Sequence, residues 1–224
     1  MKKNNIILDL DQTLIYGEPV KDFKNNFYQK AIKFTFYNMD NTYIIFERPH
    51  LQEFLDFLFS NFNVSIWTAA SKDYALFVIK NVILKKPNRK LDFILVSYHC
   101  RISEKKNKHK HTKYLQLLNG DFGLTHMTQQ NTFILDDYKN DVYISQPDKC
   151  ILASEFIFKN QNSETDDFLS NLILKMKPLI QVDDVRKIIP EINKSFNSKL
   201  NEKEDEIESE SEEESESESD DETD

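Results

Sequence analysis

Short apolar segments alternate with helical patterns along most of this chain, and this order constrains the possible fold more than any other feature. Chains with such an order build a central parallel sheet that is covered by helices on both faces and joined by right-handed crossovers. We therefore expect an α/β fold. The expected strands cover residues 6–8, 63–67, 91–98 and 132–135, and the expected helices cover residues 48–58, 72–84, 113–118 and 166–179.

A second, smaller set of strands is expected between the first apolar strand and the first helical pattern. Residues 33–37 and 41–47 are rich in β-branched and aromatic side chains, which favour strands. Because the two segments follow one another closely, they predict a small antiparallel insertion after the first strand of the parallel sheet.

Polar residues follow three of the expected parallel strands. Asp9 follows residues 6–8, Thr68 follows residues 63–67, and Asp136 follows residues 132–135. In open α/β sheets, ligands bind beyond the carboxyl ends of the strands. The sequence therefore predicts an active site at this edge of the sheet.

The segment after the first strand reads Asp9-Leu10-Asp11-Gln12-Thr13 and carries two carboxylates and a hydroxyl at alternating positions. Because alternate side chains of an extended backbone project to the same side, one carboxylate can attack phosphorus while the other handles the proton. Acidic residues and threonine after a strand also form turns and helix caps, so the pattern alone leaves a purely structural role open.

A phosphoryl group in transfer carries negative charge on three equatorial oxygens, so its catalysis requires cations and hydrogen-bond donors. Thr68 and Lys113 can meet this need, although each also has an ordinary structural interpretation, as a helix cap and a surface lysine. Carboxylates beside a phosphate require a divalent cation, and Mg²⁺ prefers oxygen ligands. An acidic doublet at the end of a buried strand is costly without a cation or partner. The candidate Mg²⁺ ligands are Asp9, Asp11, Asp136 and Asp137.

The net charge of −9 combines two parts of opposite sign. Residues 201–224 hold 15 acidic side chains and one lysine, a net charge of −14, which leaves +5 for residues 1–200. This composition predicts one folded domain over residues 1–194 and a disordered acidic, serine-rich tail over residues 195–224. The tail is expected to be a solvated spacer, to bind basic partners, or to fold back on a basic loop over residues 103–112.

The remaining composition bears on the compartment. Two cysteines, Cys100 and Cys150, no visible secretory leader and no apolar run of membrane-spanning length predict an intracellular protein with reduced thiols. Nucleus and cytoplasm are both left open. We expect no membrane partner and no direct nucleic-acid partner.

Several segments resemble the FCP/SCP-type phosphatases of the haloacid dehalogenase superfamily, which act on the carboxy-terminal domain (CTD) of RNA polymerase II. The DxDxT motif of that family is similar to Asp9, Asp11 and Thr13. The resemblance extends from about residue 6 to residue 189. Its further segments are residues 48–55, 67–71 and 113–115, Asp136-Asp137, Gln146-Pro147, and residues 184–186.

The resemblance implies a role for each residue of the catalytic set. Asp9 would be the nucleophile that becomes an aspartyl phosphate. Asp11 would be the general acid/base that protonates the leaving alcohol and then activates water. Thr13 would orient this loop, and it is grouped with Thr68 and Lys113 as the phosphate-binding set.

By the same resemblance, Mg²⁺ would be held by the Asp9 carboxylate, the Asp11 carbonyl and a carboxylate of the pair Asp136-Asp137, with Asp137 favoured as the direct ligand. The implied fold is a haloacid dehalogenase-like Rossmannoid sheet without a large cap, and an open site favours a macromolecular substrate. We therefore predict a Mg²⁺-dependent protein serine/threonine phosphatase that acts on phosphopeptides like those of the RNA polymerase II CTD. The alternative is a catalytically weak phosphopeptide-binding or scaffold protein that uses its acidic tail to bind partners.

Overall fold

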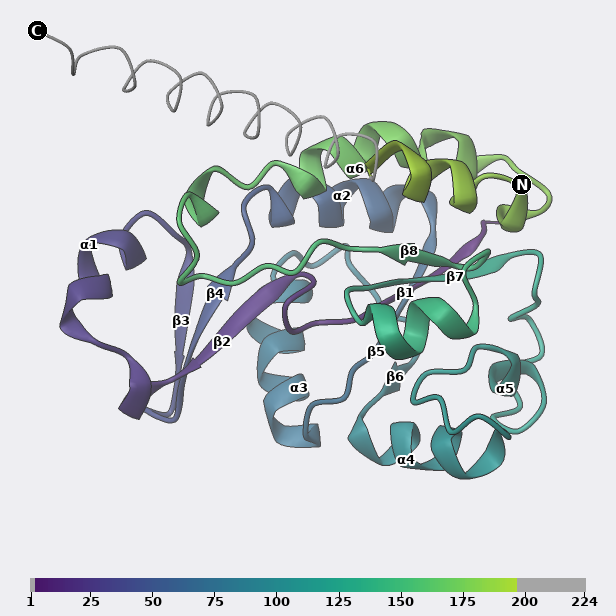
Figure 1. Cartoon of the computed structure of the whole chain (residues 1–224), viewed down its shortest axis with the longest axis horizontal. Helices are drawn as coiled ribbons and strands as arrows, with labels where there is room; N and C mark the ends of the chain where they lie inside the picture. The colour runs from purple at the N-terminus through teal and green to yellow at the C-terminus, as the bar shows by residue number, and fades with distance from the viewer. Residues whose placement is uncertain (1–2, 197–224) are drawn as a thin grey trace, which may run out of the picture.

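A five-stranded parallel sheet forms the centre of the structure, which is a computed structural model that describes residues 3–196 (Figure 1). Strand β1 lies in the middle, and Leu8 is paired with Ile66 on one side and with Leu135 on the other. The expected parallel sheet is thus confirmed. Its strands, in spatial order, are β6 (Ile94–Leu95), β5 (Asn63–Trp67), β1 (Asn5–Leu8), β7 (Thr132–Asp136) and β8 (Cys150–Leu152).

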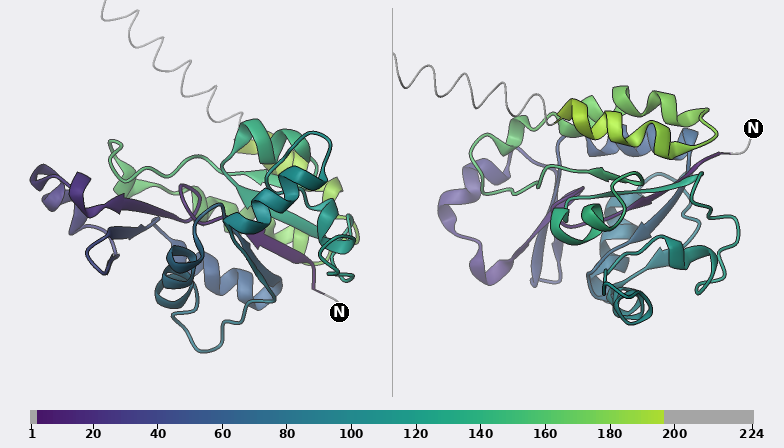
Figure 2. Two further views of the ribbon diagram at one scale, coloured as in Figure 1. Left: turned by 90° about the horizontal axis from the view of Figure 1, so that it is seen from below. Right: turned by 45° about the vertical axis from the view of Figure 1, so that its right-hand side comes forward.

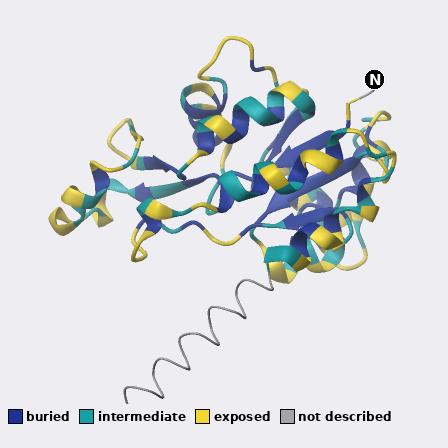
Figure 3. Cartoon of the chain, turned by 90° about the horizontal axis from the view of Figure 1, so that it is seen from above, coloured by how far each residue is buried: buried dark blue, intermediate teal, exposed yellow. Residues whose placement is uncertain are grey.

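Helices cover both faces of this sheet because the side chains of each strand alternate between two cores. Ile6 and Leu8 of β1 belong to the larger core, whereas Ile7 belongs to the smaller one. In Figure 3 the strands are buried and the exposed residues lie on the outer surfaces of the helices and loops. The larger core is covered by α2 (Leu51–Asn61), α3 (Lys72–Val78) and α6 (Phe168–Met176), and the smaller one by α4 (Ser97–Lys106) and α5 (Gln116–Asn119).

The expected antiparallel insertion is present as a three-stranded sheet in the order β2-β4-β3. Asp40 and Asn41, at the turn between its two consecutive strands, both have positive φ (45° and 56°), and the Thr42 amide closes the turn by donating to the Met39 carbonyl over 2.8 Å. Figure 2 shows this sheet, with the short α1 (Tyr28–Ala31), projecting from one end of the parallel sheet. Its strands are β2 (Ile15–Pro19), β3 (Phe36–Met39) and β4 (Tyr43–Glu47).

The structure differs from the sequence-based expectation in the region after β5. A strand was expected over residues 91–98 and a loop over residues 103–112, whereas β6 covers only Ile94–Leu95 and α4 begins at Ser97. The reason is that β6 is an edge strand whose single neighbour, β5, ends at Trp67, opposite Leu95. The strand therefore has no pairing partner beyond that point.

Several shorter elements complete the described residues. Strands β2 and β8 have no counterpart among the expected segments, and residues 189–196 form a helix that carries the chain to the end of its described part. None of the helices among residues 3–196 is long and apolar enough to cross a membrane. Single 3₁₀ turns occupy Val20–Asp22, Asn25–Phe27, Ser163–Thr165, Lys177–Ile180 and Val185–Lys187, and π-helical turns occupy Ile79–Ile83 and Lys139–Tyr143.

Candidate active site at the carboxyl edge of the parallel sheet

The loop after β1 is a tight turn that brings three polar side chains to one edge of the sheet. The amide of Leu14 donates to the carbonyl of Leu10 over 2.9 Å, and Gln12 takes a left-handed backbone conformation with φ of 61°. Leu10 and Leu14 are fully buried, so the intervening polar residues are held by the core on both sides. This local structure explains why the polar residues 11–13 lie between two buried leucines.

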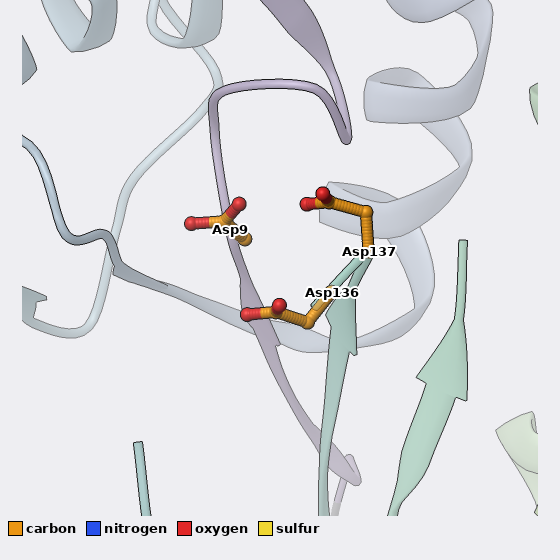
Figure 4. A group of neighbouring side chains, drawn as sticks. All are labelled: Asp9, Asp136 and Asp137. Carbon is orange, nitrogen blue, oxygen red and sulfur yellow. The ribbon is translucent and has the colours of Figure 1, made fainter. Parts of the chain in front are cut away.

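Three carboxylates meet at the ends of the neighbouring strands β1 and β7. Carboxylate oxygens of Asp9, Asp136 and Asp137 all lie within 4.8 Å of one another. Figure 4 shows Asp9 and Asp137 facing each other across the gap between the two strands, with Asp136 beneath them. Asp9 is 6% exposed and Asp136 only 1%, so the cluster lies largely out of solvent.

Lys113 supplies positive charge to this cluster from within the protein. Its Nζ donates to Asp9 Oδ1 over 2.6 Å and to Asp136 Oδ2 over 2.7 Å, and the residue is 4% exposed. Burial alone would lower the pKa of Lys113, but the carboxylates of Asp136 and Asp9 outweigh burial and raise it. Lys113 therefore stays an ammonium at neutral pH. It is buried at the acidic site and is not the surface lysine that the sequence left open.

Burial disfavours the ionised form of the Asp9 carboxyl group. Desolvation raises the pKa of Asp9 well above its ordinary value, Lys113 counteracts this rise, and Asp136 adds to it. The site thus concentrates negative charge where one ammonium cannot balance it. Such a site has a strong electrostatic tendency to take up a proton or a cation.

Thr13 and the two acidic residues after β7 have distinct surroundings. The Thr13 hydroxyl donates to Asp137 Oδ1 over 2.8 Å and lies 3.4 Å from Asp9 Oδ2, so it ties the loop after β1 to the acidic pair. Asp136 has both oxygens engaged, Oδ2 by Lys113 and Oδ1 by the Tyr138 amide at 2.9 Å. Burial raises the pKa of Asp137.

Asp11 is not part of the three-carboxylate cluster. Its Oδ1 accepts a hydrogen bond of 2.5 Å from the hydroxyl of Tyr74, a residue of α3. Burial raises the pKa of Asp11, and the hydrogen bond from Tyr74 acts in the opposite direction. Sequence reasoning did not single out Tyr74, because a tyrosine in the first turns of a helix carries no signal of a contact with the loop after β1.

Thr68 lies at the same edge of the sheet, directly after β5. It is 1% exposed, its amide donates to the Leu95 carbonyl over 3.0 Å, and its hydroxyl oxygen accepts from the Ala70 amide over 3.1 Å. The register that pairs Leu8 with Ile66 places Thr68 beside the start of the Asp9 loop. A contact between Thr68 and phosphate stays a prediction.

The backbone around Lys113 is fixed by two residues that sequence reasoning did not assign to the site. Asp141 accepts hydrogen bonds from the amide and the hydroxyl of Thr112 and contacts His111 Nδ1 at 2.7 Å. The side-chain amide of Gln146 donates to the Lys113 carbonyl over 2.8 Å. Gln146 belongs to a segment that resembles the phosphatase family, but no pattern in the sequence points to Asp141.

Comparison with known proteins gives consistent relationships. The family model described as NLI interacting factor-like phosphatase matches residues 4–186. A CTD phosphatase-like protein, 355R, of Invertebrate iridescent virus 6 is 46% identical over 172 residues, which cover 75% of this chain and 94% of that protein. Its counterpart in Invertebrate iridescent virus 3 is 43% identical over 173 residues, which cover 74% and 90%.

Among solved structures, a variant of the fission yeast RNA polymerase II CTD phosphatase Fcp1 bound to beryllium fluoride is similar, with a TM-score of 0.48 and 17% identity. The similarity covers 93% of this chain and 66% of that one.

The family match and the α/β fold define the class of this protein, an FCP/SCP-type phosphatase of the haloacid dehalogenase superfamily. The chain belongs to the NLI interacting factor-like phosphatases, because the family model spans most of it and a relative 46% identical is matched over 94% of its own length. It is therefore an enzyme, a phosphatase.

Proposed function

We propose that this phosphatase is a Mg²⁺-dependent protein serine/threonine phosphatase that works through an aspartyl phosphate on Asp9. The observation that carries the proposal is the buried carboxylate of Asp9, which shares Lys113 with Asp136 and faces Asp137. A carboxylate that lies among other carboxylates, with an ammonium in contact, is suited to attack a group that arrives with a cation.

The donor set fits Mg²⁺. Three carboxylates, of which Asp9 and Asp136 are buried and Asp137 is partly exposed, and one ammonium leave an uncompensated negative charge, and their oxygens are near enough to one another to share one small cation. Asp9 and Asp137 are the proposed side-chain ligands, with the Asp11 carbonyl as a further oxygen, because Asp136 already has both oxygens engaged. A bound Mg²⁺ would neutralise this charge and polarise a phosphoryl oxygen.

In the first half-reaction, an Asp9 carboxylate oxygen forms a bond to phosphorus as the bond from phosphorus to the serine or threonine oxygen breaks. The carboxylic acid of Asp11 gives its proton to the serine or threonine oxygen, and the alcohol leaves. In the second half-reaction, the Asp11 carboxylate takes a proton from water, whose oxygen attacks phosphorus while the bond to Asp9 breaks. Lys113 and Thr68 are proposed to hold the phosphoryl oxygens, and Thr13 to orient the loop.

We propose phosphopeptides like those of the RNA polymerase II CTD as the substrate class. The names of the two viral relatives, which call them CTD phosphatase-like, support this choice. Tyr43 of the antiparallel sheet, 36% exposed, packs edge-on against Tyr74 with ring centroids 5.3 Å apart, and so offers an aromatic surface near Asp11. An extended peptide can use such a surface, whereas a small phosphate ester is too short to need it.

Hydrolysis of 4-nitrophenyl phosphate with and without Mg²⁺ tests this proposal. Wild type should be active only with Mg²⁺, and Asp9→Asn should lose at least about 10³-fold in kcat, because the amide cannot form the acyl phosphate. Wild type quenched during turnover should carry a hydroxylamine-sensitive phosphoryl group that Asp9→Asn lacks. Asp22→Asn, at an exposed carboxylate, is the matched control and should behave as wild type. Equal rates for wild type and Asp9→Asn, or none for either, would contradict the proposal and favour the scaffold alternative.

A further inference from the structure

The hydroxyl of Tyr74 forms a hydrogen bond with the side chain of Asp11. It donates to Asp11 Oδ1 over 2.5 Å, and the tyrosine is only 9% exposed, so the contact lies largely away from water. Asp11 is the residue to which we assign the proton transfers, yet it stands apart from the cluster of Asp9, Asp136 and Asp137. Its orientation must therefore be set by groups outside that cluster.

The antiparallel sheet provides the space that Tyr74 needs. Gly17 of β2 lies against the Tyr74 hydroxyl so closely that a Cβ at residue 17 would collide with the hydroxyl oxygen. Gly17 has no positive φ, so close approach, and not backbone conformation, is the reason for a glycine here. On another side of the ring, Tyr43 of β4 packs edge-on against it.

We propose that Tyr74 is a positioning residue that holds the Asp11 carboxyl in the orientation from which Asp11 transfers protons, and that Gly17 makes room for the hydroxyl that does so. The inference rests on the acid/base role proposed for Asp11. It gives the antiparallel sheet a part in the chemistry, because β2 and β4 enclose the tyrosine that contacts the loop after β1.

The direction of the hydrogen bond also selects the oxygen that reacts. The Tyr74 hydroxyl donates a hydrogen bond to Oδ1, so Oδ1 is the acceptor. In the neutral carboxylic acid the proton is therefore on Oδ2. Oδ2 would give this proton to the leaving oxygen and would later take one from water, while Oδ1 stays bound to Tyr74 in both half-reactions. A free carboxyl would instead rotate about its bond to Cβ, and a poorly oriented acid loses rate.

Two substrates of similar shape separate this role from a structural one. Phenyl phosphate has a more basic leaving group than 4-nitrophenyl phosphate, so its cleavage depends more on the general acid. Tyr74→Phe keeps the ring and removes the hydroxyl. It should lower kcat/KM for phenyl phosphate by about tenfold more than for 4-nitrophenyl phosphate, and Asp11→Asn should show the same selectivity more strongly. Tyr37→Phe is the matched control, because its hydroxyl bonds to Glu47 on the same antiparallel sheet over 2.7 Å.

Gly17→Ala tests the same contact from the other side. In wild type the new methyl group should displace the Tyr74 hydroxyl and reproduce the selective loss on phenyl phosphate. In the Tyr74→Phe background it should add less, because no hydroxyl remains to be displaced and the nearest ring carbon, 3.2 Å from the new Cβ, needs to shift by only a few tenths of an ångström.

The possible outcomes distinguish the two proposals. An equal loss on both substrates for Tyr74→Phe, beside a selective loss for Asp11→Asn, would overturn the role of Tyr74 and leave the proposed mechanism intact. An equal loss on both substrates for Asp11→Asn would overturn the acid role of Asp11 and the role of Tyr74 with it. Additive losses from Gly17→Ala and Tyr74→Phe would overturn the role assigned to Gly17.

Discussion

At the scale of single residues, the site concentrates carboxyl groups whose pKa values are raised mainly by burial. This holds for Asp9, Asp11 and Asp137. A carboxyl group with a raised pKa in the folded state binds more protons there than in the unfolded chain. Its contribution to stability is therefore present below the unfolded pKa of about 4 and is lost as pH rises through the folded pKa.

The thermal stability of the metal-free protein should accordingly fall as pH rises above about 4. Mg²⁺ should reverse this effect, because it competes with the protons for the same oxygens. At pH 7.5 and a Mg²⁺ concentration 100 times its Kd, the gain should be about 2.7 kcal/mol, a rise in Tm of roughly 5–10 °C, and it should be smaller at pH 5. Scanning calorimetry measures both. Asp137→Asn removes a proposed ligand and should abolish most of the Mg²⁺ effect, so an undiminished shift in this variant would contradict the assignment.

At the scale of elements, one buried arginine joins the loop after β1 to two distant segments. The Arg48 guanidinium donates to the Thr13 carbonyl over 3.0 Å, to the Ser154 carbonyl over 2.9 Å and to both oxygens of Asp166 over 2.8 Å. Its side chain is fully buried and lies over the ring of Phe168, 4.5 Å from the centroid. Arg48 therefore fastens the carbonyl side of the DxDxT loop to the segment that leads into α6.

Arg48→Leu should destabilise the fold strongly. The change leaves Asp166 and two main-chain carbonyls without their donor, and because the Arg48 side chain is fully buried whereas that of Asp166 is partly exposed, the loss should be about 3 kcal/mol, the lower end of the range for buried pairs. Urea unfolding measures the loss. Arg186→Leu is the matched control, because Arg186 pairs with Asp184 where both side chains retain contact with solvent, and its loss should cost less than about 1 kcal/mol. Equal losses in the two variants would show that Arg48 is not the anchor inferred here.

Sequence patterns locate the elements of this fold better than they locate the contacts between them. The run at Asn63–Trp67 has the apolar, β-branched character of a buried strand, and it forms β5 as expected. The short edge strand β6 could not be delimited, because its length depends on where β5 ends. Asp9, Thr13, Lys113 and Asp137 lie together as the motif order predicts, whereas the contact of Asp11 with Tyr74 depends on packing between α3 and the antiparallel sheet.

At the scale of the whole molecule, charge separates the chain into two parts. The division into a phosphatase domain over residues 1–194 and an acidic tail over residues 195–224 stays a proposal, and residues 197–224 lie outside the described part of the structure. Residues 195 and 196 continue the last described helix. Within the described part, the basic segment over residues 103–112, just before Lys113, exposes Lys105, Lys108 and Lys110. Because the charge of this segment is opposite to that of the tail, we expect the tail to bind there.

Deletion of residues 201–224 should raise kcat/KM toward an acidic phosphopeptide by about tenfold at low ionic strength, if the tail competes for the basic segment. The difference should vanish near 0.5 M salt, where charges are screened within a few ångströms. Steady-state kinetics at the two salt concentrations measures it. As a control, the lysines of the basic segment are replaced by serine, and in that background the same deletion should leave kcat/KM unchanged. An unchanged kcat/KM at low salt would exclude this competition. The positions to be exchanged are Lys105, Lys106, Lys108 and Lys110.

The contacts of Asp141 bear on how such an enzyme can diverge. The Asp141 carboxylate contacts the side chains of His111 and Thr112, the two residues before Lys113. The side chains of Ser103 and Asn107 donate to the His111 carbonyl over 2.7 Å and 2.8 Å. The position of Lys113 is therefore set by the contacts of Asp141, Ser103 and Asn107 with the two residues before it, and not by the exposed residues 108–110. Insertions and substitutions in that short stretch can accumulate during evolution without displacing the lysine, so new substrate preferences can arise there while the chemistry stays unchanged.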